Sequence, residues 1–363
     1  MSDVLLVAEN FPPRSGGIPT LLRNIASRSS HDFTVLTGEH DRADDSKFDF
    51  DVVRVDNEGY LGDLRFLLEL VRLNRGHDVL YYGKPMDSFG ALGSVFTSNR
   101  VVSHVHGRET YIYIERLRSY VRKFFLYFGL RFVDDFISVS NFTAGRLRDL
   151  GIKEDRIEVV HNAVEFDRFY EAEAAPRSDI GVPEDYFLII TVARLDRKKS
   201  HDLVLEALEK LENTHYLIVG TGPERENLEE KAENLAVSDK VTFAGYVEEE
   251  KLPGYYKTSD LYVMPSRFIE ETGNIETFGI SFLEANAAGK AVIGADNGGM
   301  EESIKDCETG FLAETDPQDI RDKIIKLKEE DNLRSEMEEN AVEWAREHDW
   351  PKIIDKIDEI LEP

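Results

Sequence analysis

Four cationic side chains stand close together directly after a short apolar run in the second half of the sequence. They are Arg194, Arg197, Lys198 and Lys199, and the run before them, Phe187–Val192, has the composition of a buried strand. Arginine offers a planar fork of donors and lysine a compact charge, which together suit two adjoining phosphates. A charge cluster can also be a solvated surface, but this one interrupts the more acidic half of the chain. We therefore expect a polyanion, such as a diphosphate, at this loop.

Two carboxylates, Glu276 and Glu284, are eight residues apart after the apolar run Leu261–Met264. A helix beginning near Phe278 would leave Glu276 in the preceding loop and place Glu284 more than one turn inside the helix. The free amides and the positive dipole end of that helix would then face the same loop. A glycosidase pair must flank a scissile bond, and one carboxylate in a loop with one inside a helix fits that geometry poorly.

In the first half, Gly16 and Gly17 follow the strand-like run Val4–Ala8 and precede a helix expected from about Thr20. Two adjacent glycines at a helix N-terminus allow bare amides to approach an oxyanion. The spacing is neither the dinucleotide fingerprint G-x-G-x-x-G nor a P-loop, so a simple turn remains the alternative.

A histidine-rich strand end is the second candidate of the first half. His106 and Gly107 follow the apolar run Val101–Val105, where a side chain can face a ligand. We expect His104 to point the other way or to lie deeper, and to serve packing. No spacing of cysteines and histidines is typical of zinc, so we expect no metal in the site.

Short apolar runs alternate with amphipathic stretches along the whole chain, which predicts parallel βαβ sheets covered on both faces. The predicted strands are Val4–Ala8, Phe33–Leu36, Val52–Val55, Val79–Tyr82, Val101–Val105, Phe136–Val139, Ile157–Val160, Phe187–Val192, Tyr216–Val219, Val241–Phe243, Leu261–Met264 and Ala291–Ile293. The predicted helices include Leu61–Leu73, Leu203–Leu211 and Asn227–Ala236. Ligands of such sheets bind beyond the carboxyl ends of the strands, where all the loops above lie.

Two such sets of elements predict two doubly wound domains. The first spans 1–165 and the second 166–344, with a boundary stretch over 164–185 that has no strand pattern. The stretch 319–361 reads as helix, which Pro351 should break or kink, and its last part, about 345–363, is expected to pack back on the first domain.

Composition narrows the class of protein. The 363 residues carry a formal charge of −27, which argues against nucleic acid as a partner. The charge is uneven, with 22 basic and 25 acidic residues in 1–170 against 22 and 46 in 171–363. A solvated acidic surface explains this, as does a first half that must approach something anionic. One cysteine, no signal peptide and no apolar stretch of spanning length predict a cytoplasmic protein.

Taken together, these motifs resemble the family-4 retaining glycosyltransferases of the GT-B fold over nearly the whole chain. The matching pieces are Pro12-Pro13-x-x-Gly16-Gly17, His106-Gly107, Ser138-Val139-Ser140, His161-Asn162-Ala163-Val164, Arg194-Leu195 with Lys199, Val219-Gly220-x-Gly222-Pro223, Phe243-x-Gly245-Tyr246, Pro265-Ser266, Glu276-x-Phe278-Gly279 with Glu284, and Gly298-Gly299-x-x-Glu302. The resemblance implies two facing Rossmann-like domains with a cleft between them. It also implies a hexosyltransferase that uses a UDP- or GDP-sugar as co-substrate, retains the anomeric configuration and needs no cofactor or metal.

The resemblance also implies roles for single residues. Arg194 and Lys199 would hold the donor diphosphate, and the amides of Gly16 and Gly17 would touch its distal phosphate. The leaving nucleoside diphosphate would be stabilised by these cations and amides, and its phosphate would accept the proton of the acceptor. This arrangement needs no separate protein base.

The same resemblance assigns the sugar and nucleoside contacts. Glu276 would bind hydroxyls of the donor sugar, Glu284 the ribose hydroxyls, and Val247 would lie along the base. His106 would contact the donor sugar and help shape the reaction centre. Backbone amides directed at the sugar and phosphate would come from Phe278, Gly279 and Ile280. The sequence departs from the family pattern at Ser200, where glycine is usual, at Ala163, and in a longer loop over 267–275.

The acceptor is expected to be a glycan or a lipid-linked molecule. The stretch 111–133 combines five basic residues with aromatic ones against a single acid, Glu115, which suits peripheral contact with an anionic membrane. The alternative is that its aromatic side packs on the sheet and its basic side is solvated. Two other functions stay open: a nucleotide-sugar epimerase of the same two-domain fold and a non-catalytic nucleotide-sugar-binding subunit.

Overall fold

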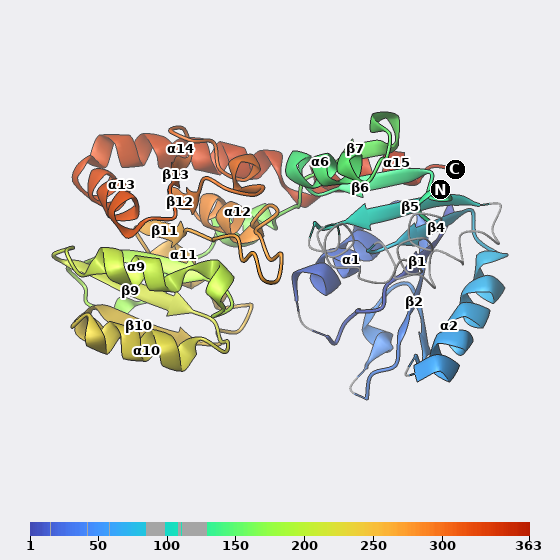
Figure 1. Cartoon of the computed structure of the whole chain (residues 1–363), viewed down its shortest axis with the longest axis horizontal. Coiled ribbons are helices and arrows are strands. Elements are labelled where there is room, and N and C mark those ends of the chain that lie inside the picture. The colour runs from blue at the N-terminus through green and yellow to red at the C-terminus, as the bar shows by residue number, and fades with distance from the viewer. Residues whose placement is uncertain (15, 42, 58, 85–98, 108–109, 111–128) are drawn as a thin grey trace. The chain divides into compact units, whose positions relative to one another are not determined.

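The computed structural model describes all residues except 15, 42, 58, 85–98, 108–109 and 111–128. The chain divides into two compact units, one of Met1–Asn162 with Pro351–Pro363 and the other of Ala163–Trp350. Each unit is an α/β layer structure around one parallel sheet (Figure 1).

The described strands of the first unit form a seven-stranded sheet in the order β3-β2-β1-β4-β5-β6-β7. They are β1 Asp3–Val7, β2 Asp32–Gly38, β3 Asp51–Val55, β4 Val79–Tyr82, β5 Arg100–Val105, β6 Asp135–Ser138 and β7 Ile157–Val159. The described helices are α1 Gly17–Arg28, α2 Gly59–Asn74, α6 Asn141–Asp149 and α15 Trp350–Leu361, with 3-10 turns at η1 Asp45–Lys47 and η3 Glu154–Arg156. All the predicted strands of this half are present, and α1 begins three residues earlier than expected.

The second unit holds a six-stranded parallel sheet in the order β10-β9-β8-β11-β12-β13. Its strands are β8 Phe187–Val192, β9 Thr214–Val219, β10 Val241–Gly245, β11 Leu261–Met264, β12 Val292–Ala295 and β13 Gly310–Ala313. Its helices are α7 Phe166–Tyr170, α8 Arg177–Ile180, α9 His201–Leu208, α10 Arg225–Asn234, α11 Leu252–Thr258, α12 Ile280–Ala287, α13 Pro317–Glu329 and α14 Asp331–Glu347, with 3-10 turns η4 Arg197–Lys199, η5 Ser238–Lys240 and η6 Met300–Glu302.

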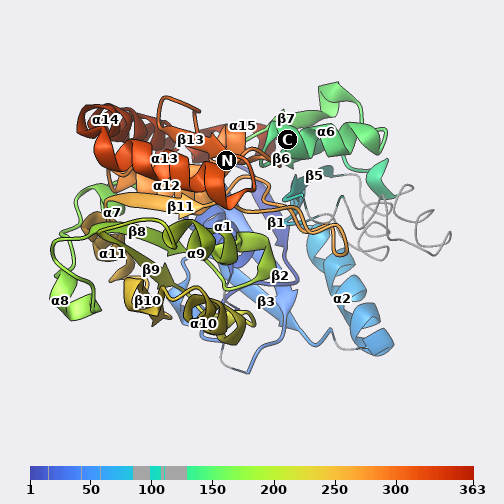
Figure 2. The same cartoon turned by 60° about the vertical axis from the view of Figure 1, so that its left-hand side comes forward.

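Both faces of the second sheet are buried, as a parallel sheet requires. Leu188 and Ile190 of β8 pack into a core with side chains of α7, α11, α12 and α14. Ile189, which alternates with them, belongs to a second core formed with α9, α10 and α13. Figure 2 shows α9, α10 and α13 on one side of this sheet. This double layer of helices holds the strand ends, and therefore their loops, in fixed positions.

Three features differ from the sequence-based expectation. Strand β13 was not predicted, because it is short and begins at Gly310 with Phe311 as its only large β-forming residue. The stretch 164–185 contains α7 and α8. The helical stretch 319–361 is broken just before Pro351, as predicted, but a further break at 330 makes it three helices. Pro351 lies in the first turn of α15, where proline costs no helix hydrogen bond.

Helix α15 is attached to the first unit through Asp358. The Asp358 carboxylate accepts hydrogen bonds from the Ser29 hydroxyl at 2.6 Å and from the Ser30 amide at 2.8 Å. His31 donates from Nε2 to the Asp358 carbonyl at 3.0 Å, while its Nδ1 accepts from the Ser2 amide. Residues 351–363 therefore belong to the first unit.

Candidate active site

The loops that follow β8 and β11 meet in the second unit. The two strands are parallel neighbours, with Leu261 opposite Ile189 and Tyr262 opposite Ile190. Their carboxyl ends therefore lie at the same edge of the sheet, and the loop after each begins beside the other. The cationic turn comes from the first loop, and Glu276 comes from the second.

Glu276 joins the two loops through a partly buried ion-pair cluster. Its Oε2 lies 2.5 Å from the Lys199 ammonium and 3.3 Å from the Lys198 ammonium. The Glu276 side chain is only 12% exposed. Burial opposes its charge, but the two ammonium groups outweigh this and lower the pKa of Glu276 from 4.5 to about 2. The carboxylate is therefore ionised at neutral pH and occupies the position in front of both lysines.

The cationic turn is a single 3-10 turn, η4, closed at its start by Asp196. The Asp196 side chain accepts a hydrogen bond from the Lys199 amide. Arg194 lies before this turn, is exposed, and forms no ion pair with a described residue. The two phosphate ligands predicted from the sequence therefore differ in their surroundings. Lys199 forms an ion pair with Glu276, and Arg194 is exposed to solvent.

Gly279 sets the start of α12 in a way that only glycine allows. Its φ is 87° and ψ is 72°, and a Cβ there would lie 2.6 Å from the Phe282 ring. The helix begins at Ile280 with no acidic residue in its first turn, so its free amides are uncompensated. Phe278, directly before, is buried and anchors the turn in the core.

The backbone of Glu276 is also fixed, by a second glycine pair. The Gly299 amide donates to the Glu276 carbonyl at 3.0 Å, and a Cβ at Gly298 would lie 2.2 Å from that oxygen. The sequence motif Gly298-Gly299 therefore positions Glu276.

Glu284 lies inside α12, as its spacing predicts, in surroundings opposite to those of Glu276. Burial raises the pKa of its carboxyl group, and its Oε2 accepts a hydrogen bond from the Tyr256 hydroxyl at 2.7 Å. No described cation forms an ion pair with it. The pKa values of the two carboxylates of one motif therefore shift in opposite directions, lowered by two lysines at Glu276 and raised by burial at Glu284.

Two residues follow the end of β10 at the predicted base-binding position. Tyr246 is 74% exposed, whereas Val247 is partly buried against the core formed with α7, α11, α12 and α14. Val247 therefore presents an apolar edge beside an exposed ring.

The candidate residues of the first unit lie at the carboxyl ends of β1, β4 and β5. His106 Nε2 lies 2.7 Å from the Gly83 carbonyl, and its ring stacks on His104 with centroids 4.6 Å apart. The expectation that His104 points the other way is wrong, because residues two apart in a strand share a face. His104 lies deeper on that face, is 2% exposed and bonds the Tyr81 hydroxyl at 2.6 Å, so its expected packing role fits.

The glycine pair of the first unit caps α1. Gly16 is its N-cap with φ 144°, the helix begins at Gly17, and no side chain caps it. A Cβ at Gly17 would meet nothing within 4 Å, so this helix end is open. Lys84 and Glu9, 2.5 Å apart, form an ion pair at the same strand ends that sequence reasoning did not single out.

Sequence reasoning also missed the supports of the second-unit site. Lys198 was counted in the cationic run but not as a partner of Glu276, and Tyr256 and Arg267 were not considered. Each of the three is separated in sequence by 28 to 78 positions from the residue that it contacts. The order of the strands in the sheet brings these residues together.

Residues 111–128, most of the basic aromatic stretch, lie outside the described residues. In the described part of the chain, no group of three or more His, Cys, Asp or Glu could hold a metal ion. Among the described helices, none combines the length and apolar character that crossing a bilayer requires.

Comparison with known proteins identifies the class. The model of "Glycosyltransferase Family 4" matches residues 15–168, and that of "Glycosyl transferases group 1" matches residues 174–344. The chain is 29% identical over 353 residues to the GDP-mannose-dependent α-(1-6)-phosphatidylinositol monomannoside mannosyltransferase of Mycobacterium tuberculosis, covering 90% of this chain and 89% of that protein. It is 26% identical over 353 residues to a related mannosyltransferase of Corynebacterium glutamicum, which acts on the monoacylated acceptor, covering 92% and 90%.

Solved structures share the fold at lower identity. Anabaena Alr3699/HepE in complex with UDP superposes with a TM-score of 0.83 at 20% identity, covering 99% of both chains. Sucrose-phosphate synthase of Thermosynechococcus elongatus gives a TM-score of 0.80 at 18% identity, covering 99% of this chain and 98% of that one. The family matches agree with the two parallel-sheet units and with the motifs of both units, and they decide the enzyme class that the sequence left open. The chain belongs to the family-4 retaining glycosyltransferases of the GT-B fold and is a nucleotide-sugar-dependent hexosyltransferase.

Proposed function

We propose that the second unit binds the donor, with its diphosphate on Lys199 and Arg194 and its sugar at Glu276. The observation that carries this is the cluster of Lys198, Lys199 and Glu276 at the shared edge of β8 and β11. Two cations whose only described anion is one carboxylate offer an exchangeable site, because a diphosphate brings more charge than the carboxylate it replaces.

Exchange gives Glu276 its second role. When the diphosphate takes over the lysines, the Glu276 carboxylate stays near them, since its backbone is fixed through Gly299. It is then available to accept hydrogen bonds from hydroxyls of the donor sugar. The amides of Gly279 and Ile280 add donors for the charge that grows on the leaving diphosphate. Glu284 binds the ribose hydroxyls, and Val247 with Tyr246 lies along the base.

The first unit contributes the remaining contacts in this proposal. The open amides of Gly16 and Gly17 bind the distal phosphate, and His106 contacts the donor sugar at the reaction centre. The acceptor hydroxyl attacks from the face that the leaving phosphate occupies, and that phosphate takes its proton. Transfer then proceeds with retention and without a metal ion.

For substrates, we propose a GDP-sugar, with GDP-mannose first, and a lipid-linked acceptor of the phosphatidylinositol type. Support comes from the mannosyltransferases that match over nine-tenths of the chain and whose names give that donor and that acceptor class. The basic aromatic sequence of 111–133 supports a lipid acceptor independently, because such a stretch suits an anionic membrane surface.

A transfer assay tests the proposal. Purified protein is incubated with radiolabelled GDP-mannose or UDP-glucose, phosphatidylinositol monomannoside in mixed micelles, and EDTA. We expect a labelled glycolipid with GDP-mannose that EDTA does not diminish. Transfer from UDP-glucose alone would contradict the donor, transfer only to water-soluble glycans would contradict the acceptor, and loss of transfer in EDTA would contradict metal independence.

Membrane contact is tested separately by sedimentation with liposomes. We expect binding to vesicles with anionic lipid at 0.1 M salt that falls at high salt, since screening weakens such contacts. Equal sedimentation with neutral and anionic vesicles would remove the support for 111–133.

A further inference from the structure

The turn that carries the site lysines ends in a conformation that its residue type disfavours. Ser200 follows Lys199 and has a φ of 58° and a ψ of 34°, in the left-handed region. Ser200 is also fully buried. Among amino acids only glycine adopts this region without steric cost. Some other contact must therefore hold Ser200, and with it the direction of the turn.

Arg267 supplies that contact. Its Nε donates to the Ser200 hydroxyl at 2.8 Å, and its Nη2 donates to both carboxylate oxygens of Asp202, at 2.7 and 2.8 Å. Its backbone amide donates to the Lys198 carbonyl at 2.8 Å. One residue of the β11 loop thus holds the turn before, at and after its left-handed residue.

The loop that begins with Arg267 is the loop that ends with Glu276. Ile269 and Asn274 pair as an antiparallel bridge, with the Ile269 amide donating to the Asn274 carbonyl at 2.8 Å. This pairing closes the loop on itself and keeps its two ends near each other. One end holds the backbone of the lysine turn, and the other end binds the lysine side chains.

We propose that Arg267 is a positioning residue for donor binding: it holds the left-handed turn at Ser200 and so directs the Lys198 and Lys199 side chains into the diphosphate site. Arg267 touches neither the donor nor the reacting atoms in this inference, which rests on the proposed role of Lys199. Arg267 then matters for the donor because residue 200 is not glycine.

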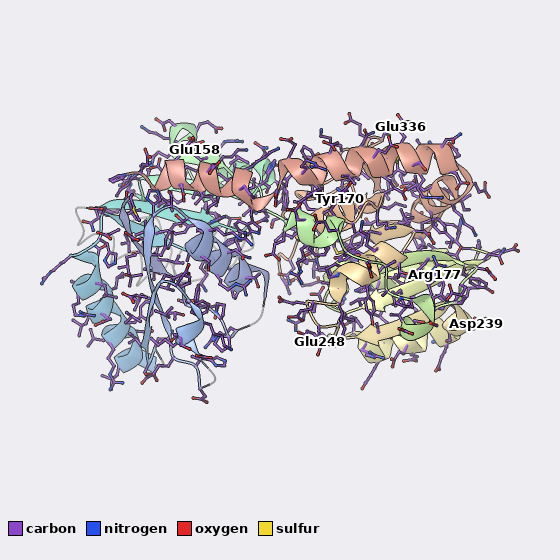
Figure 3. The ribbon with its side chains drawn as sticks, turned by 180° about the vertical axis from the view of Figure 1, so that it is seen from behind. Glu158, Tyr170, Arg177, Asp239, Glu248 and Glu336 are labelled. Atoms are coloured by element: carbon purple, nitrogen blue, oxygen red, sulfur yellow. The ribbon has the colours of Figure 1, made fainter. Side chains whose placement is uncertain are left out.

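A binding experiment with full-length protein separates this role from a merely structural one. Calorimetry measures the Kd of GDP and of UDP, and the tighter ligand is used throughout. We expect Arg267→Gln to raise this Kd about tenfold, because the turn loses its fixed direction. The matched control is Arg177→Gln, in the same unit (Figure 3). Arg177 donates to Asp260 at 2.9 Å, and Asp260 directly precedes β11, at the amino end of that strand. That variant should lose thermal stability and keep its Kd.

The second arm uses glycine at position 200. Glycine takes the left-handed conformation without strain, so the turn should no longer depend on Arg267. Adding Arg267→Gln to Ser200→Gly should then raise Kd less than threefold relative to Ser200→Gly alone. A full tenfold rise in this background would contradict the inference, as would wild-type Kd in the Arg267→Gln single variant.

Lys199→Ala, measured in parallel, separates the positioning role of Arg267 from the donor site proposed at Lys199. If Lys199→Ala weakens nucleotide binding and Arg267→Gln does not, the positioning role is wrong while the donor site stands. If Lys199→Ala binds nucleotide as the wild type does, the donor site itself is wrong, and the role of Arg267 falls with it.

Discussion

The buried Glu276 carboxylate gives a prediction whose size can be worked from the structure. Its pKa falls from 4.5 to about 2 because the attraction of Lys199 and Lys198 exceeds the cost of burial. At 1.36 kcal/mol per pKa unit, this difference is worth about 3 kcal/mol of unfolding free energy at neutral pH. Glu276→Gln keeps the shape and one acceptor, so we expect a loss of about 1–3 kcal/mol.

The pH dependence of that loss has a defined sign. Glu276 has a lower pKa folded than unfolded, so its contribution is complete above about pH 4.5 and disappears as the pH falls toward 2. The difference in stability between wild type and Glu276→Gln should therefore shrink when the pH falls from 7 to 3. Denaturant unfolding followed by fluorescence measures it, because Trp344 lies in α14 of the second unit.

Glu284→Gln is the matched control, on the same helix motif. Burial raises the pKa of Glu284, and no described lysine or arginine pairs with it, so removing its charge should leave stability at pH 7 equal or higher. Equal destabilisation by the two substitutions would refute the reasoning. So would a Glu276→Gln deficit that stays constant down to pH 3.

Three further outcomes follow from single contacts. Gly279→Ala should lower stability by about 1–3 kcal/mol and weaken nucleoside diphosphate binding in calorimetry, because the φ of 87° becomes strained and the new Cβ meets the Phe282 ring. Gly289→Ala is the control for strain, because Gly289 has a similar φ but its new Cβ would come no closer than 3.8 Å to another side chain. The Gly289→Ala variant should keep its affinity for the nucleoside diphosphate. Tyr256→Phe should cost about 1–2 kcal/mol in denaturant unfolding at pH 7, because the Glu284 carboxylate loses its hydrogen bond; an unchanged midpoint would contradict this. Asp358→Ala should speed amide hydrogen exchange in α15 before the rest of the first unit, because the bonds to Ser29 and Ser30 are lost; uniform exchange would contradict the anchoring.

Much of the architecture follows from local patterns in the sequence. Runs such as Phe187–Val192 are apolar on both faces, which is the mark of a central parallel strand, and β8 has those bounds. Strand β13 was not predicted, because Gly310 and a single large β-forming side chain do not make a recognisable strand pattern. The helix break at 348–349 was predicted from Pro351, whereas the break at 330 has no proline or glycine beside it to mark it.

The candidate site divides in the same way. The loop position of Glu276 and the helical position of Glu284 follow from the predicted helix start near Phe278, and α12 begins two residues later, at Ile280. The pairing of Glu276 with Lys199 could not, since 77 residues separate them and the order of β8 and β11 decides it. Their opposite pKa directions depend on which cations the fold supplies, and that information is not local.

A crystal structure of the protein with a bound nucleotide-sugar tests the central claim most directly. We expect pyrophosphate oxygens within about 3 Å of the Lys199 ammonium and the Arg194 guanidinium, with Glu276 released from Lys199 and bonded to sugar hydroxyls. A pyrophosphate bound elsewhere, with the Lys199–Glu276 ion pair intact, would contradict it.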